Sequence, residues 1–169
     1  MGTEETIRDI LQKAYQIEVD GYTFYSMTAD RATKPAVREL FEKLARDEVE
    51  HQRYLRDVMR SVDTEGASAF RVQLKVPGMA DFSRRIFTDA FRDQAQGAAF
   101  EVAVLSIGMQ LESNAVAYFS GAAERATEDE VRAFYRFLAD WEKEHLNALQ
   151  NLHQAVRSDF WERAGFAPF

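Results

Sequence analysis

The chain has 169 residues, a formal net charge of −7 and 46% hydrophobic residues, which is typical of one folded domain and excludes a disordered chain. It contains no cysteine, which excludes disulfides, thiolate zinc sites, cysteine nucleophiles and iron–sulfur centres. The acidic balance argues against nucleic acid as a partner. Because no apolar run is long enough to span a membrane and the N-terminus is acidic, we expect no membrane partner and a cytoplasmic location.

The first half of the chain predicts a helical hairpin over residues 3–62. Thr3 can cap a helix that runs to about Ala32. Pro35 is a typical first residue of a helix, and the second helix is predicted to run to about Val62. The near absence of proline and glycine within these stretches supports two long helices.

A crossover over residues 63–87 is predicted to lead to a second hairpin over residues 88–158. Its first helix should run from about Thr88 to Arg125. A capping box, Thr-Glu-Asp-Glu at 127–130, then precedes a helix that should end near Ser158. The expected fold is therefore all-α, with four helices in two antiparallel hairpins.

The remaining residues, 159–169, hold several aromatic side chains. An aromatic flap that covers one end of the bundle is favoured over a peptide that binds a partner. We therefore predict that residues 1–169 form a single domain.

The two predicted hairpins are copies of each other. Residues 15–55 align without a gap with residues 109–149, which lie 94 positions later, and more than a third of the aligned pairs are identical. Similar composition alone would not produce so many identities. A duplicated hairpin joined by a long crossover is the expected origin of a four-helix bundle.

Each predicted helix has an apolar stripe with spacings of three and four residues. The stripes are interrupted at one level by six polar side chains: Glu18, Glu48, His51, Glu112, Glu142 and His145. Four buried carboxylates would repel one another and lose hydration, at a cost of several kcal/mol each. No Lys or Arg lies on the stripes to balance them.

Two divalent cations would balance the four carboxylates, and they accept oxygen and imidazole ligands. Glu48 and His51 are three residues apart on one helix face, and Glu142 and His145 repeat this spacing. One Glu from each of two helices and a Glu-x-x-His pair from each of the other two is the ligand pattern of di-iron bundles. The six residues therefore predict a paired metal site, and a metal-free cluster is the alternative.

The motifs that surround these residues are Gln16-Ile17-Glu18 with Phe24-Tyr25, Asp47-Glu48-Val49-Glu50-His51, Gln110-Leu111-Glu112 with Tyr118-Phe119, and Trp141-Glu142-Lys143-Glu144-His145. Over roughly residues 5–157 the chain resembles ferritin-like di-iron carboxylate proteins, and most closely a rubrerythrin-type domain. Two differences stand out. The chain lacks the cysteines of a rubredoxin domain, and Ala115 holds the position of an additional glutamate.

The resemblance implies a ferritin-like bundle and a role for each ligand. Glu48 and Glu142 would bridge the metals, Glu18 and Glu112 would each bind one of them, and His51 and His145 would each supply one nitrogen. The implied cofactor is a pair of iron ions, with manganese or mixed occupancy as alternatives.

The resemblance also implies an oxidoreductase that reacts with hydrogen peroxide or dioxygen, as a rubrerythrin-like peroxide reductase. A ferroxidase that handles iron is one alternative. A helical interaction module with a structural metal is another, although six side chains over two ions leave positions for exogenous ligands. The expected partners are the small oxidant and a separate electron-donor protein. A second copy of the chain, giving a homodimer, is a further expectation.

Gly21 and Ala115 each follow a predicted ligand by three residues and so should lie beside the metals. These small side chains either keep a channel open or let the helix backbones approach, and the sequence does not separate the two interpretations. Asp47 could orient a histidine ligand from outside the metal shell. For Tyr22, simple packing is favoured over contact with a ligand. Glu101 should lie about 16 Å from the ligand on its own helix, too far to join the site.

Overall fold

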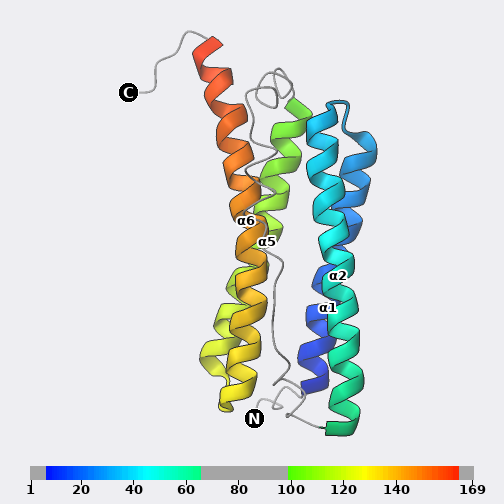
Figure 1. The fold of residues 1–169 in the computed structure, drawn as a ribbon. Helices are drawn as coiled ribbons and strands as arrows, with labels where there is room; N and C mark the ends of the chain where they lie inside the picture. The colour runs from blue at the N-terminus through cyan, green and yellow to red at the C-terminus, as the bar shows by residue number, and fades with distance from the viewer. Residues whose placement is uncertain (1–6, 66–98, 164–169) are drawn as a thin grey trace.

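The computed structural model describes residues 7–65 and 99–163. Within these ranges the chain forms four helices and no strand: α1 (Ile7–Arg31), α2 (Pro35–Glu65), α5 (Ala99–Arg125) and α6 (Asp129–Arg163). The helices α1 and α2 form one antiparallel hairpin, α5 and α6 form a second, and the hairpins stand side by side (Figure 1). The prediction of an all-α bundle of two helical hairpins is confirmed.

The two hairpin turns repeat the same hydrogen bonds. Arg38 Nη2 donates to the carbonyl oxygen of Ala32 over 2.9 Å, and Arg132 Nη2 donates to that of Ala126 over 2.8 Å. Each guanidinium satisfies a carbonyl that the end of a helix leaves without an intrahelical partner. Because the paired residues lie 94 positions apart, the duplication extends to the turns.

Two helix ends differ from the predictions. The helix α6 runs to Arg163, so the first five residues of the predicted aromatic tail are helical. The helix α2 runs to Glu65, three residues beyond Val62. Both helices continue because glycine, which commonly ends a helix, comes only at Gly66 and Gly165. Thr3, residues 66–98 and the proposed flap beyond Arg163 lie outside the described residues.

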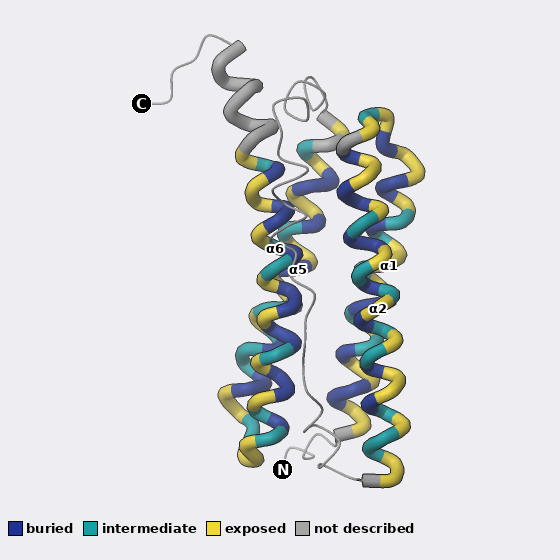
Figure 2. Tube along the Cα trace, in the orientation of Figure 1, coloured by how far each residue is buried: buried dark blue, intermediate teal, exposed yellow. Residues whose placement is uncertain are grey.

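The buried apolar side chains form two clusters, one toward each end of the bundle. Buried positions recur along all four helices (Figure 2). The first core cluster surrounds the α1–α2 turn and contains Tyr25, Phe41, Leu44, Leu105 and Leu149 among others. The second core cluster surrounds the α5–α6 turn and contains Leu11, Leu55, Phe119, Phe134 and Leu138 among others. On every helix the predicted ligands lie between residues of these two clusters, so a polar layer divides the core.

Within the described part of the chain, no helix combines the length and the hydropathy that crossing a membrane requires.

Candidate metal centre

All six predicted ligand side chains are buried, with exposed fractions between 0% for Glu18 and 8% for His51. The helix α1 supplies Glu18 and α5 supplies Glu112, while α2 and α6 each supply a Glu-x-x-His pair. Each helix thus contributes to the layer at the position that its apolar stripe predicts. The structure brings together every residue of the predicted set.

The ligand atoms form two groups that share one residue. Glu48, Glu112, Glu142 and His145 place donor atoms within 4.8 Å of one another, and Glu18, Glu48 and His51 form the second group. Since Glu48 belongs to both groups, it has the position that a bridging carboxylate needs. Glu142, the second bridge that the resemblance implies, belongs to one group only.

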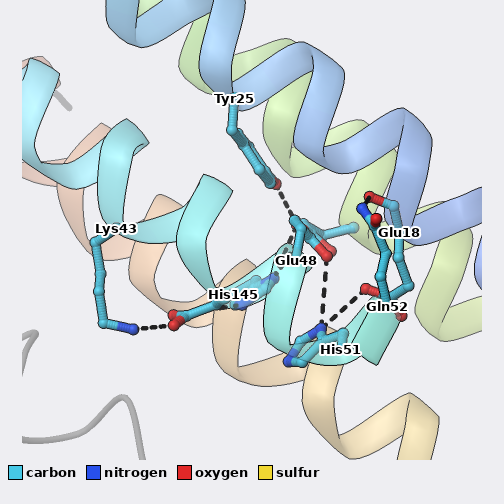
Figure 3. Close-up of polar contacts among 9 residues, drawn as sticks. Glu18, Tyr25, Lys43, Glu48, His51, Gln52 and His145 are labelled. Atoms are coloured by element: carbon cyan, nitrogen blue, oxygen red, sulfur yellow. Dashed lines mark hydrogen bonds and ion pairs between the residues drawn. The ribbon is translucent and has the colours of Figure 1, made fainter. Parts of the chain in front are cut away.

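Both histidines turn Nδ1 toward the carboxylates (Figure 3). His51 Nδ1 lies 2.9 Å from Glu18 Oε2 and 3.5 Å from Glu48 Oε2. His145 Nδ1 lies 3.3 Å from Glu48 Oε1 and 3.4 Å from Glu112 Oε1. Each histidine nitrogen therefore faces two carboxylates, as it would beside a cation that all three bind.

Several of these buried atoms have no hydrogen-bond partner among the described residues: Glu18 Oε1, Glu48 Oε2, Glu142 Oε1 and His145 Nδ1. Buried polar atoms are nearly always satisfied, so four at one level need an explanation. All four are lone-pair donors to metals, and two divalent cations would satisfy them together. The residues therefore fit a pair of metal ions.

Without a cation, burial and repulsion raise the pKa of two of the carboxyls. Burial first, and then the charge of Glu48, raises the pKa of Glu18 to about 8. Burial, followed by the charges of Glu18 and Glu112, raises the pKa of Glu142 well above its usual range. In the metal-free chain, part of the negative charge is therefore removed by protonation.

The pKa values of Glu112 and His145 shift in the directions that favour their charged forms instead. Burial opposes the charge of Glu112, but the adjacent His145 outweighs it and lowers the pKa of this carboxyl. Burial also opposes the charge of His145, yet Glu48 and Glu112 raise the pKa of this imidazole well above its usual range. A metal ion would replace the proton that His145 holds, so metal binding releases protons.

Tyr25, which the sequence analysis named only as part of a motif, is a polar residue of the site. It is fully buried, its hydroxyl donates to Glu112 Oε1, and its ring stands edge-on to His145. Burial, followed by the charges of Glu112 and Glu48, raises the pKa of Tyr25 well above its usual value, so the hydroxyl keeps its proton. A tyrosine on a core stripe needs a partner for its hydroxyl, and this signal could have revealed it.

A pocket of about 250 Å³ opens between α1 and α5 and reaches Glu48, Glu112 and Glu142. Gly21 and Ala115 both line it, which supports a channel as the reason for their small size. Gly21 has a second role, because a Cβ there would lie 2.8 Å from Glu48 Oε1 and displace the carboxylate. Both interpretations therefore apply to Gly21. It keeps the pocket open, and it lets the Glu48 carboxylate lie close to the backbone of α1.

Two residues close in sequence to the candidate ligands, Glu50 and Tyr22, are exposed. Glu50 lies on the surface of α2, where Arg53 donates to it over 2.7 Å. Tyr22 is 41% exposed and lines a surface groove with Ser26 and Lys43, away from the ligands. The side chain of Glu101 lies outside the described residues.

A family model of rubrerythrin matches residues 9–153. The chain belongs to the rubrerythrin family. The matched range contains all six ligand candidates, and it confirms the predicted ferritin-like, rubrerythrin-type domain. No curated protein and no solved structure matches the chain.

In this rubrerythrin-family chain the two histidines have different neighbours. Asp47 Oδ2 lies 3.9 Å from His145 Nε2, and the Asp47 carboxylate is also paired with Lys43. His51 is stacked on Trp141 instead, with ring centroids 4.0 Å apart and an angle of 5°. Asp47 and Trp141 occupy equivalent positions in the two copies. The two copies therefore have equivalent ligand candidates, but the side chains that contact the two histidines from outside the candidate ligand set differ.

We expect Asp47→Asn to weaken the binding of one ion by about 10–100-fold and to leave the other nearly unchanged. Of the two histidines, only His145 has Asp47 beside it, and the charge of Asp47 favours an imidazole that keeps its proton on Nε2 and leaves Nδ1 free for metal. Calorimetric titration of the metal-free rubrerythrin domain with Mn(II) should resolve the two affinities. Asp140→Asn is the control, because Asp140 is exposed and paired with Lys143 on the outer face of α6. Equal weakening of both ions would contradict the assignment.

Proposed function

We propose that the protein holds two iron ions at this centre and reduces hydrogen peroxide with electrons from a separate donor protein. The observation that carries the proposal is the pocket, which opens from the surface onto carboxylates with unpartnered oxygens. A structural metal site is closed by protein ligands, whereas a catalytic site keeps a side open. The family and the mixed oxygen and imidazole ligand set support iron.

Tyr25, which is not a ligand candidate, also has a role in the proposed reaction. When bound, the two irons would supply one electron each, and peroxide needs two electrons and two protons to give two molecules of water. The hydroxyl of Tyr25 keeps its proton and donates a hydrogen bond to Glu112 Oε1. This hydrogen bond orients the carboxylate of Glu112, which lines the pocket.

The walls of the centre are suited to excluding bulk water. The first core cluster closes the layer on one side and the second core cluster closes it on the other. The pocket between α1 and α5, which Gly21 and Ala115 both line, gives access to the layer. This enclosure favours reaction with small molecules over exchange of the metal ligands with solvent.

The Fe(II)-loaded protein should react faster with hydrogen peroxide than with dioxygen and should keep its iron afterwards. Two irons provide the two electrons that peroxide needs in one encounter, whereas reducing dioxygen to water requires four. Stopped-flow mixing of the anaerobic, reduced protein with each oxidant in turn measures the two rates. Iron analysis after gel filtration then measures what remains bound.

A ferroxidase would give the opposite pattern. It would react faster with dioxygen, and repeated additions of excess Fe(II) would be oxidised in many turnovers per chain. That result would replace the peroxide reductase with an iron-handling function at the same site.

A further inference from the structure

The pocket above the centre points to the kind of oxidant that the site accepts. We propose that it binds uncharged organic hydroperoxides, with the organic group held between α1 and α5 and the hydroperoxide group turned toward the carboxylates. This inference rests on the proposed function and narrows its substrate class.

The pocket is much larger than hydrogen peroxide. Its volume is about 250 Å³, whereas one water molecule occupies roughly 30 Å³ of liquid and an apolar cavity of about 150 Å³ is enough to bind benzene. An oxidant with only two oxygen atoms would leave most of this volume to water. A short alkyl group or a single aromatic ring would fill it.

The walls of the pocket are apolar and come in equivalent pairs from the two copies. Ile17 of α1 and Leu111 of α5 occupy the same position in the duplication, and both line the pocket. Tyr118 adds an aromatic wall. Leu111 is 38% exposed although it is a large hydrophobic residue, so an organic group bound there would remove apolar surface from water.

Polar atoms are confined to the floor and the rim. The carboxylates of the centre form the floor, and unpartnered oxygens of Glu48 and Glu142 lie there. At the rim, Asp20 accepts a hydrogen bond from Gln16, and Asn114 accepts the equivalent one from Gln110, each over 2.8 Å. A ligand with one polar end and one apolar end therefore matches the pocket along its depth.

The charges around the pocket exclude anionic oxidants. Asp20 is negative at the rim, and none of the described residues that line the pocket is Lys or Arg. Lys13, whose ammonium lies over the Tyr118 ring, is not among the lining residues. A fatty-acid hydroperoxide would bring its carboxylate toward Asp20 at the opening, and no Lys or Arg among the described lining residues would balance it. An uncharged alkyl or aryl hydroperoxide brings no such charge.

The reaction follows the chemistry of the proposed function. The O–O bond breaks, one oxygen leaves as an alcohol and the other as water. The two irons, when bound, would supply the two electrons, two protons come from solvent, and the donor protein would return the two electrons.

Binding is tested first without turnover. The probe is 2-phenyl-2-propanol, the alcohol formed from cumene hydroperoxide, titrated into the metal-free protein and followed by NMR chemical shifts. We expect saturable binding that Leu111→Trp weakens about tenfold, because the added bulk occupies the pocket. Ile107→Trp is the matched control, since Ile107 is also exposed on α5 but does not line the pocket, and it should leave binding unchanged. Ile17→Trp, the equivalent change on α1, replaces Leu111→Trp if that variant fails to fold.

Turnover is then compared for cumene hydroperoxide and hydrogen peroxide in the iron-loaded protein. We expect kcat/KM to be higher for cumene hydroperoxide than for hydrogen peroxide. Leu111→Trp should lower the ratio of kcat/KM for cumene hydroperoxide to kcat/KM for hydrogen peroxide by about tenfold, whereas Ile107→Trp should leave it unchanged. The protein could reduce hydrogen peroxide but neither bind the alcohol nor reduce cumene hydroperoxide. That result would overturn this substrate class and leave the proposed function standing. Reduction of neither peroxide would overturn both.

Discussion

Glu48→Ala should abolish the binding of both metal ions, from about two per chain to near zero. Glu48 is the residue whose oxygens reach both groups of ligand atoms, so its removal takes a ligand from each ion. Loss of one ligand from a buried site also leaves the remaining charges poorly balanced. The measurement is metal analysis of protein loaded anaerobically with Fe(II) or Mn(II) and then separated from free metal.

The matched control is Glu50→Ala on the same helix. Glu50 is exposed and paired with Arg53, so its removal should leave the metal content unchanged. One ion or fewer per chain in the unaltered protein, with no change on Glu48→Ala, would contradict a paired site bridged by this residue.

The metal-free protein should lose stability as the pH rises from about 4.5 to about 8. Glu18 has its pKa raised to about 8 in the folded chain, whereas its ordinary value is 4.5. Between these values the folded state binds more protons than the unfolded state, so the free energy of unfolding falls with increasing pH. A shift of this size corresponds to at most about 5 kcal/mol.

Two other groups of the layer with raised pKa values, Glu142 and His145, also lower the free energy of unfolding as the pH rises through this range. The raised pKa of Glu142 gives the folded state more protons above about pH 4.5, and the raised pKa of His145 does so above about pH 6.5. The lowered pKa of Glu112 acts oppositely, but only at more acidic pH. Stability should therefore decrease steadily toward neutral and mildly alkaline pH.

Urea unfolding at a series of pH values, with a chelator and then with metal, measures this dependence. Bound cations replace the protons, so the metal-loaded protein should show a much flatter profile and a higher midpoint at pH 8. Glu18→Gln should flatten the metal-free profile, whereas Glu50→Gln should not. An unaltered slope in Glu18→Gln would show that this carboxyl is not the group that titrates.

The fold was predictable because the sequence contains the same local signals twice. Heptad-like stripes define the inward face of each helix, and the position of Pro35 defines the start of α2. The ligand set followed from the same periodicity, since Glu18 and Glu112 interrupt stripes that are otherwise apolar. The end of α6 was predicted too early, because several aromatic residues after Ser158 suggested a separate tail although no helix-breaking residue precedes Gly165.

The environment of the ligands depends on contacts between helices, which periodicity along one helix does not contain. The hydrogen bond from Tyr25 to Glu112 joins α1 to α5. The stacking of Trp141 on His51 joins α6 to α2, and the approach of Asp47 to His145 joins the same pair of helices in the other direction. The effect of Gly21 on the carboxylate of Glu48 likewise required coordinates, because it depends on the 2.8 Å that would separate a Cβ at Gly21 on α1 from Glu48 Oε1 on α2.

The polar layer between the two core clusters also has a consequence for cooperativity. Each cluster packs one end of the bundle, and the six ligand side chains lie between them on all four helices. With metal, these side chains are cross-linked through the ions, so opening one end requires opening the other. Without metal, no ion links the four helices at this level, and we expect the ends to behave as two separate foldons with different rates of amide hydrogen exchange. Metal occupancy would then determine whether the bundle unfolds as one unit or two.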